Sequence, residues 1–330
     1  MHGMISSRIE FMWRGVKMQY IHSTEEVARH KECVVVLGNF DGVHKGHQKL
    51  FEVAKHEAEE KDLETVVFSF YPHPTWVIGN CPKHLLISRA DKKQMIEALG
   101  VDVLVEYPFT KEFASISPEE FFTGILIEKL KARVIVVGSN YYFGRDKAGN
   151  PSFLKALGRI HDVEVCIVEA VKRNDQMISS SKIRQLISSG KIEVASEMLG
   201  HPYRVRGTVT KGKQLGRTIG FPTINLVADE CRIYPPNGVY ATKIKVYSKT
   251  YLGMTNIGYN PTVNGERKMI ETHIFDFNEE LYGKDVEVEF YHFIRPEQKF
   301  NNIEALKRQI DQDQQKILQF FKDSRMSIAK

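Results

Sequence analysis

Two histidines three residues apart, His44 and His47, are the clearest chemical signal in the first half of the sequence. They lie in GNFDGVHKGHQKLF (38–51), which directly follows an apolar run and opens a helical pattern. At a helix N-terminus, backbone N–H groups and the helix dipole already favour an anion. Two imidazoles there could donate to the α- and β-phosphates of ATP as charge builds on them during in-line attack. Two surface histidines in a glycine-rich turn are the alternative, but the position directly after a strand favours catalysis.

A second candidate site lies in RGTVTKGKQLGRTIGFPTINL (206–226), where glycines and basic residues stand between two β-like segments. Glycine allows backbone N–H groups to approach phosphates closely, so this loop could cradle ATP, although it is not a Walker A sequence. Thr223 and Asn225 lie on one side of an extended segment, and their neutral oxygens suit Mg²⁺ already held by phosphates. Glycines needed only for turns are the alternative. The residues predicted to bind ATP here are Lys211, Gly212, Gly216, Arg217, Gly220, Pro222, Thr223 and Asn225.

The elements that must position the histidines form a repeated unit of a short apolar run, a loop and a helical pattern. Continuous Val/Ile runs separated by helices predict a parallel, doubly wound α/β sheet. Ligands bind outside the carboxyl ends of such strands, so the loops after Leu37, Phe70 and Val137 are expected to line one site. One helix is predicted to begin with a capping box of Ser117 and Glu120. The runs are Cys33–Gly38, Thr65–Phe70, Val101–Tyr107, Arg133–Ser139 and Val163–Ala170.

The pattern changes after Gly200. Between Tyr203 and Ile294, short alternating segments joined by Gly, Pro and Asn turns predict an antiparallel barrel or sandwich. An amphipathic helix follows and is expected to pack across the barrel, because apolar residues recur at helical spacing. The length of 330 residues exceeds a usual single domain. We therefore expect domains at 18–198 and 199–330, after an extension (1–17) without function that is a tag, a flexible arm or an upstream misreading of the start. The apolar helix positions are Ile303, Leu306, Ile310, Ile317 and Phe321.

Composition narrows the class of protein. Lys plus Arg exceed Asp plus Glu by 46 to 41, a mild excess that suits phosphate-bearing ligands and is too small to indicate nucleic acid binding. The four cysteines are far apart without paired spacing, so neither a zinc site nor a disulfide framework is predicted, and a reducing cytoplasm fits best. No apolar run approaches the roughly 20 residues of a membrane span, and no signal peptide is visible. We expect a protein that does not associate with a membrane and is a monomer or a weak homo-oligomer.

The first half resembles the HxGH nucleotidyltransferases, and within them the FMN adenylyltransferase domain of prokaryotic FAD synthetases. The resemblance covers about 18–198 and rests on the blocks GNFDGVHKGHQ, FSFYPHP, VVGSNYYFG and SSSKIRQLI. It implies that two blocks bind ATP through Gly38, Asn39, Phe40, Asp41, Gly42, His44, Gly46, His47, Ser179, Ser180, Ser181 and Arg184. It implies that the other two blocks lie beside the nucleotide or flavin through Pro72, His73, Pro74, Asn140, Phe143 and Gly144.

Each of these blocks also has a plainer interpretation. A proline-flanked histidine such as His73 is more often part of a rigid loop. Asn140 stands where the family has Asp or Asn, and its neutral amide cannot supply the charge that Asp would. Ser179 to Ser181 could simply cap a helix, although hydroxyls, N–H groups and the Arg184 guanidinium could together hold a triphosphate.

The second half resembles riboflavin kinase from about Gly200 to the last helix. The blocks are GRTIGFPTINL, PPNGVYAT, GMTNIGYNPTV and ETHIFDF. The resemblance implies that Thr223 and Asn225 bind Mg-ATP, and that Glu271 accepts the proton of the riboflavin 5′-hydroxyl. It also suggests that Arg295 contacts the isoalloxazine. A solvated outward-facing glutamate and a surface arginine are the plainer interpretations of these two residues.

Together the two halves predict a bifunctional enzyme of flavin cofactor biosynthesis. Its C-terminal half would phosphorylate riboflavin to FMN, and its N-terminal half would adenylylate FMN to FAD with release of pyrophosphate. Riboflavin, FMN and ATP are the expected partners, with Mg²⁺ as cofactor. Several alternatives stay open: transfer to another phosphate or a polyol phosphate by the HxGH half, a barrel that only binds ligand, one activity of the two, or a flavin-responsive regulatory protein without catalysis.

Overall fold

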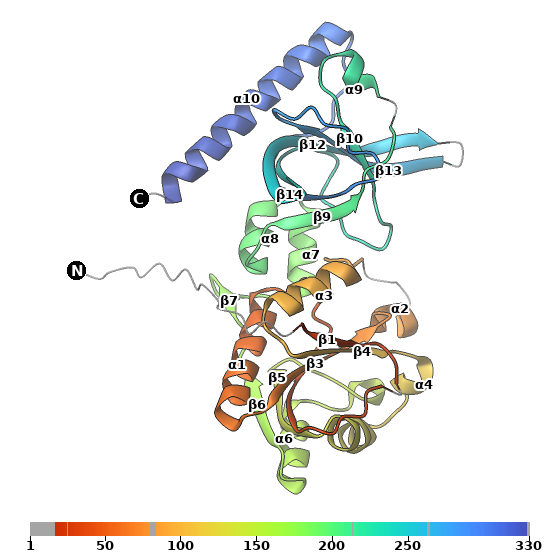
Figure 1. The fold of residues 1–330 in the computed structure, drawn as a ribbon, viewed down its shortest axis with the longest axis vertical. Coiled ribbons are helices and arrows are strands. Elements are labelled where there is room, and N and C mark those ends of the chain that lie inside the picture. The colour runs from red at the N-terminus through yellow and green to blue at the C-terminus, as the bar shows by residue number, and fades with distance from the viewer. Residues whose placement is uncertain (1–16, 25, 80–83, 213, 263–264, 329–330) are drawn as a thin grey trace, which may run out of the picture. The chain divides into compact units, whose positions relative to one another are not determined.

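The five apolar runs of the first half, together with a short strand β1 that was not predicted, form a six-stranded parallel sheet with strand order β1-β4-β3-β2-β5-β6 (Figure 1). The structure is a computed structural model that describes residues 17–24, 26–79, 84–212, 214–262 and 265–328, so nearly all of the predicted extension lies outside the described residues. All five residues of β2 are buried, as expected for a strand covered on both faces. The predicted parallel α/β fold is confirmed. The strands are β1 (Gln19–Ile21), β2 (Cys33–Leu37), β3 (Glu64–Tyr71), β4 (Val103–Pro108), β5 (Ala132–Gly138) and β6 (Glu164–Val168).

The connecting helices begin where local capping predicts. The Ser117 hydroxyl accepts from the Glu120 N–H at 3.1 Å, and the Glu120 carboxylate accepts from the Ser117 N–H at 2.7 Å, which confirms the capping box. The next nine residues, Phe121–Lys129, continue as a π-helix. The other elements up to the barrel are α1 (Lys45–Lys61), α2 (Pro74–Ile78), α3 (Arg89–Ala98), α4 (Lys111–Ala114), α5 (Pro118–Glu120), a 3₁₀ turn (Arg145–Lys147), α6 (Pro151–Ile160), β7 (Lys172–Arg173), β8 (Gln176–Met177), α7 (Ser180–Ser188) and α8 (Ile192–Leu199).

The alternating segments of the second half form an antiparallel sheet with strand order β10-β13-β12-β11-β14-β9 (Figure 1). Its two ends approach each other where the Thr210 N–H donates to the Asn225 carbonyl at 2.8 Å, so the sheet forms a nearly closed barrel. The predicted antiparallel barrel is confirmed. The elements are β9 (Tyr203–Thr208), α9 (Leu215–Thr218), β10 (Ile224–Val227), β11 (Gly238–Val246), β12 (Lys249–Thr262), β13 (Gly265–Ile274), β14 (Asp285–Arg295) and α10 (Ile303–Ile328).

The terminal helix α10 packs on this barrel as predicted. Its residues Ile317 and Phe321 share an apolar core with Val239, Ala241 and Met254. Burial of such side chains drives the docking of an amphipathic helix. The first predicted position, Ile303, is 52% exposed, so the buried stripe occupies the later turns of the helix.

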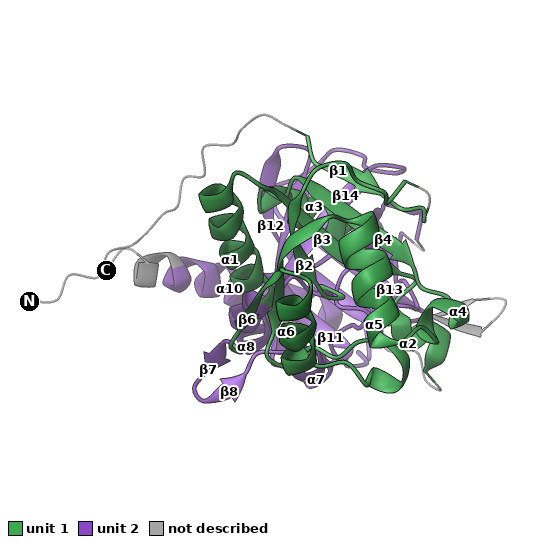
Figure 2. Cartoon of the chain, turned by 90° about the horizontal axis from the view of Figure 1, so that it is seen from below, with its two compact units in different colours: residues 1–40, 47–82, 90–170 green, residues 41–46, 83–89, 171–330 purple. Residues whose placement is uncertain are grey.

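Two compact units divide the chain (Figure 2). Unit 1 comprises residues 1–40, 47–82 and 90–170, and unit 2 comprises 41–46, 83–89 and 171–330. Within unit 2, α8 packs on β9 and β14, and Glu193 of α8 binds the imidazole of His292. The helices α7 and α8 therefore belong to the same compact unit as the barrel. The predicted boundary near residue 198 between the two activities stays a prediction.

Candidate functional site

The HxGH loop connects β2 to α1 through a backbone that ordinary residues rarely adopt. Phe40 and Val43 have φ of 53° and 39°, although neither is glycine and both side chains are buried. Such conformations are costly, above all for β-branched Val43, and persist where the surroundings over-determine them, commonly at ligand sites. Gly42 has φ of 89°, and a Cβ there would lie 2.7 Å from Leu86. The loop therefore has one defined backbone conformation with several residues at positive φ.

The two histidines differ in environment. His44 is 5% exposed, and burial lowers its pKa to about 4, so its imidazole is neutral at physiological pH and has one N–H donor. His47 lies in the first turn of α1, half-buried, with its ring edge-on to Phe40 at 5.3 Å between centroids. A Cβ at Gly46 would lie 3.1 Å from the His44 ring, so glycine gives that imidazole room.

Asp41 and Arg184, both predicted to bind ATP, bind each other in this structure. The buried Asp41 carboxylate also accepts from the backbone N–H groups of Leu86 at 2.9 Å and Ile87 at 3.3 Å. Arg184 further donates from Nε to the His84 carbonyl at 2.8 Å. The Asp41 carboxylate thus anchors the loop, and both side chains already have protein partners.

The three serines ahead of Arg184 have different surroundings. Ser179 caps α7, since its hydroxyl accepts from the Lys182 N–H at 3.3 Å, which agrees with the plainer interpretation. Ser180 donates to the Asp41 carbonyl at 2.9 Å, and Ser181 is exposed. The structure therefore brings Ser180 and Arg184 to Asp41, while the role of the serines toward a triphosphate stays a prediction.

The flanking loops of unit 1 leave β2, β3 and β5, which are neighbours in the sheet, so their carboxyl ends lie at one edge as expected. The Ser69 hydroxyl of β3 donates to the Asn39 carbonyl at 3.3 Å and links two of the blocks. His73 caps α2, which begins at Pro74, by accepting from the Thr75 N–H at 3.3 Å. The preceding residue, Pro72, directly follows β3.

The third block also has structural roles of its own. Phe143 is buried against Phe121 and stacks on Tyr141 at 5.8 Å, and Gly144 has φ of 71°. Asn140 lies in the turn that follows β5, with its Oδ1 3.3 Å from where a Gly138 Cβ would stand. Contacts of these residues with a flavin or a nucleotide stay predictions.

A cavity of about 290 Å³ in unit 2 is lined by some of the residues predicted for the kinase reaction, whereas Asn225 and Lys211 are not among its lining residues. Thr223, Glu271 and Arg295 line it together. Glu271 of β13 lies opposite Asn225 of β10 and opposite Asn256 of β12, so the three side chains share one face of the sheet. The predicted base and one predicted metal ligand are therefore neighbours.

Asn225 fits a cation site. The residue is 4% exposed, and its Oδ1 has no hydrogen-bond partner among the described residues. Buried polar atoms are rarely left unsatisfied, and carboxamide oxygens are normal ligands of Mg²⁺ and Ca²⁺. A Cβ at Gly212 would lie 2.5 Å from the Asn225 side chain, so this glycine leaves the space that the amide occupies.

The rest of the glycine-rich loop is shaped partly by its backbone. A Cβ at Gly216 would meet the Phe221 carbonyl at 2.3 Å, and Gly220 has φ of 92°, so conformation alone requires glycine at both positions. Lys211 is exposed with its Nζ 5.7 Å from the Tyr282 ring, and Arg217 is also exposed. Both cations are accessible to a phosphate, and binding of ATP by this loop stays a prediction.

Arg295 is not a free surface residue, because it forms an ion pair within the barrel domain. Its Nε donates at 2.7 Å to Asp313 of α10, whose carboxylate is fully buried. A second donor, Nη1, binds the Pro296 carbonyl at 3.0 Å. Arg295 therefore lines the cavity with its Nε and one Nη1 donor bonded to the protein, and its contact with an isoalloxazine stays a prediction.

The cavity residues that were not singled out from the sequence include the polar residues His273, Asn256 and Glu297. His273 donates from Nδ1 to the Pro222 carbonyl at 2.8 Å and so ties β13 to the Thr223 loop. Asn256 donates to Glu297 at 3.3 Å. Two-residue alternation from Glu271 could have found His273, whereas Glu297 lies in a loop that has no such period.

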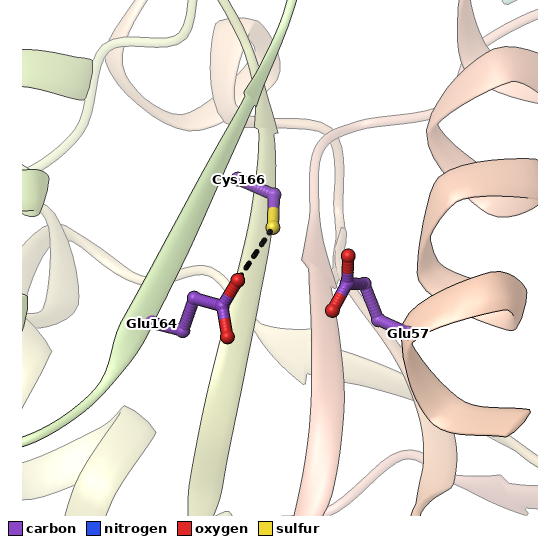
Figure 3. A group of neighbouring side chains, drawn as sticks. All are labelled: Glu57, Glu164 and Cys166. Carbon is purple, nitrogen blue, oxygen red and sulfur yellow. Dashed lines mark hydrogen bonds between the residues drawn. The ribbon is translucent and has the colours of Figure 1, made fainter. Parts of the chain in front are cut away.

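One group of side chains in the described residues resembles a metal site by composition: Glu57, Glu164 and Cys166 (Figure 3). Lys61 forms ion pairs with both carboxylates and offsets one of their two negative charges. Burial raises the pKa of the Cys166 thiol to about 11, so it stays protonated and donates weakly to Glu164 at 3.9 Å. This cluster is an ion-paired surface group.

The parallel α/β sheet with its HxGH loop and the antiparallel barrel with its cavity define a two-domain protein that joins a nucleotidyltransferase to a riboflavin kinase. Residues 26–182 match the family model for FAD synthetase, and residues 199–321 match the model for riboflavin kinase. The chain belongs to the family of bifunctional riboflavin kinase/FMN adenylyltransferases. A helix long and apolar enough to cross a membrane is absent from the described part of the chain.

Individual relatives match most of the chain, across both halves. The chain is 40% identical over 319 residues to the bifunctional riboflavin kinase/FMN adenylyltransferase of Bacillus subtilis, covering 93% of this chain and 100% of the relative. It is 41% identical to the Listeria monocytogenes protein of the same name, covering 87% and 92%. A crystal structure of a Streptococcus pneumoniae protein named as a macrolide-efflux protein has TM-score 0.82 at 36% identity, covering 91% and 98%.

Proposed function

We propose that the C-terminal part of this chain transfers the γ-phosphoryl group of ATP to the 5′-hydroxyl of riboflavin, and that the N-terminal part transfers AMP from ATP to FMN. The products are FMN with ADP in the first step and FAD with pyrophosphate in the second. The observation that carries the proposal is the row of Asn225, Glu271 and Asn256 across three strands beside one cavity.

In the kinase step, Glu271 accepts the proton of the 5′-hydroxyl as its oxygen attacks the γ-phosphorus, and the bond to the β-γ bridging oxygen breaks. Thr223 and the Asn225 carboxamide hold Mg²⁺, which when bound offsets the negative charge of the phosphates. The glycine-rich loop around Gly212 and Gly216 binds the phosphates in this proposal, as glycine-rich turns allow. The backbone N–H groups of Arg217, Ile219 and Gly220 already donate to carbonyls within the loop. His273 holds the Thr223 loop through its bond to the Pro222 carbonyl.

Cavity residues also orient the flavin in this proposal. Arg295 forms part of the wall, and its bond to Asp313 fixes the guanidinium before the ligand arrives. A side chain that is fixed in advance loses little conformational entropy on binding.

In the adenylyl step, the FMN phosphate attacks the α-phosphorus of ATP and pyrophosphate leaves. His44 and His47 donate to the phosphate oxygens as negative charge builds, without a covalent enzyme intermediate. Because burial lowers the pKa of His44, this residue acts as a neutral donor. The loop strained at Phe40 and Val43 positions both rings.

The remaining assignments are part of the same proposal. Residues 18–198 carry adenylyl transfer, 199–330 carry phosphoryl transfer, and 1–17 carry neither. The three described cysteines are free, which agrees with the reducing cytoplasm where we place the protein. Its partners are riboflavin, FMN, ATP and Mg²⁺, and we propose a monomer or weak homo-oligomer without nucleic acid or membrane contacts.

A chromatographic time course tests the proposal. Incubation of the purified protein with riboflavin, ATP and Mg²⁺ should give FMN first and FAD later. Unchanged riboflavin would support a regulatory protein without catalysis. Formation of FMN without FAD would support kinase activity and contradict adenylyl transfer. Supplying FMN in place of riboflavin separates the second step from the first.

A further inference from the structure

A short segment, residues 84–87, links the HxGH loop to the riboflavin kinase part of the sequence. It lies within the FAD synthetase match (26–182) but groups with unit 2. Leu85 pairs with Arg232 as an isolated parallel bridge. The Leu85 N–H donates to the Cys231 carbonyl at 2.7 Å, and the Ile233 N–H donates to the Leu85 carbonyl at 3.0 Å.

The Arg232 side chain strengthens this link. It is 4% exposed, and its Nη2 donates to the Leu86 carbonyl at 3.1 Å and to the Arg204 carbonyl of β9 at 2.7 Å. A buried guanidinium is costly unless carbonyls or carboxylates accept its hydrogen bonds. Because one of these carbonyls belongs to the barrel and the other to the 84–87 segment, Arg232 fixes the segment to the barrel.

The same short segment also holds the HxGH loop. Its backbone N–H groups at Leu86 and Ile87 donate to the Asp41 carboxylate, and its His84 carbonyl accepts from Arg184. Asp41 is three residues before His44. The main chain of the segment therefore forms hydrogen bonds both to the barrel and to Asp41 of the HxGH loop. A shift of the segment would be transmitted to Asp41.

We propose that Arg232, although it lies in the riboflavin kinase part of the chain, is a positioning residue for adenylyl transfer. It acts through residues 84–87 and Asp41 on the loop that carries His44 and His47. This inference rests on the assignment of adenylyl transfer to that loop. Arg232 is not among the residues that line the kinase cavity, so its loss should spare FMN formation.

The test compares full-length variants in two separate assays, FMN to FAD and riboflavin to FMN. Arg232→Met removes both hydrogen bonds and should lower kcat/KM for FAD formation by about tenfold or more, since small misplacements of catalytic groups can cost up to about a hundredfold. FMN formation should stay within about twofold. Arg206→Met is the matched control, because Arg206 is also a barrel arginine but pairs with Glu287. It should leave FAD formation within about twofold.

Three results would overturn the proposal: an unchanged rate of FAD formation in Arg232→Met, an equal loss in both reactions that follows a lower melting temperature, or an equal loss of FAD formation in the control. If Arg232→Met does not fold, the same two assays are made with Arg232→Lys. Its ammonium keeps the charge but lacks the planar fork of donors. A loss confined to FAD formation is expected for it, and wild-type rates in both reactions would overturn the proposal. Wild-type protein that makes no FAD from FMN would refute the assigned activity instead.

A double-mutant cycle separates positioning from general destabilisation. Asp41→Asn weakens the other end of the same link, so the double variant with Arg232→Met should lose little more FAD formation than the worse single variant. Losses that multiply would show that the two residues act independently and would overturn the proposed link.

Discussion

Glu271 and Asn225 lie directly opposite each other on the neighbouring strands β13 and β10. Side chains opposite each other on one face of a sheet have Cβ atoms about 5 Å apart. A carboxylate that can take a proton thus lies beside a carboxamide oxygen that can bind a cation. This pairing places the proposed proton acceptor beside the proposed metal ligand, and the first two predictions test those roles.

Glu271→Gln should slow FMN formation by about 10²–10⁴, because the amide keeps size and hydrogen bonding but cannot accept the hydroxyl proton. Conversion of supplied FMN to FAD should stay near normal. Separate rate measurements for the two steps check this. Glu280→Gln, at an exposed position, is the control and should leave both rates unchanged. A Glu271→Gln enzyme with normal kinase activity would contradict the role of the base.

Gly212→Ala should lower the apparent Mg²⁺ affinity of the kinase reaction, since the new Cβ would stand 2.5 Å from the Asn225 amide and displace it. Displacement of a metal ligand by its neighbour commonly costs about 10- to 100-fold in metal affinity. A Mg²⁺ titration of the kinase rate should therefore shift to about tenfold higher concentration. In Gly207→Ala the nearest atom to the new Cβ is 3.6 Å away, so that variant should titrate as wild type.

His47→Ala should lower FAD formation by about 10²–10³, the usual cost of removing one donor to a developing anion. FMN should then accumulate when riboflavin is the substrate. His56→Ala serves as control, because His56 is an exposed histidine on the same helix. Equal losses in riboflavin phosphorylation and FAD formation would refute the assignment of His47 to one step.

The stability of the full chain should fall as pH drops from about 6.5 toward 4. Burial lowers the pKa of His44 from 6.5 to about 4, so the unfolded chain binds a proton in this range that the folded chain does not. Above pH 6.5, His44 is neutral in both states and does not reduce the free energy of unfolding. Below pH 4, its contribution lowers the free energy of unfolding by at most about 3 kcal/mol. Denaturant unfolding at several pH values should show a shallower decline in His44→Gln. An identical decline in both proteins would contradict a buried neutral His44.

A fragment of residues 171–330 should be more stable than one of residues 200–330. The longer fragment keeps α8, which buries Ile192, Ala195, Met198 and Leu199. Loss of that helix exposes the apolar surface that it covers on β9 and β14. The melting temperature of the shorter fragment should be lower by about 5 °C or more. Both should phosphorylate riboflavin, and a folded fragment that makes no FMN would contradict the placement of the kinase site.

The sequence alone determined the features that depend on local order. Continuous Val runs indicated buried parallel strands, and the loop that carries the HxGH motif directly follows β2, so its place at a strand end followed from chain connectivity. Alternation in the second half indicated the barrel, and helical spacing indicated α10. These patterns are readable because period 2 and period 3.6 reflect which face of one element is buried.

The tertiary structure decided which distant residues meet. Glu271 lies beside Asn256 only because β13 pairs with β12 in one register, and a slip of one residue would turn Glu271 to the other face. The contact of Arg232 with the Leu86 carbonyl joins residues 146 positions apart. Arg295, a plausible surface residue by sequence, is bound to Asp313 once α10 is docked. Such contacts follow from how whole elements pack, and no periodicity within one segment encodes them.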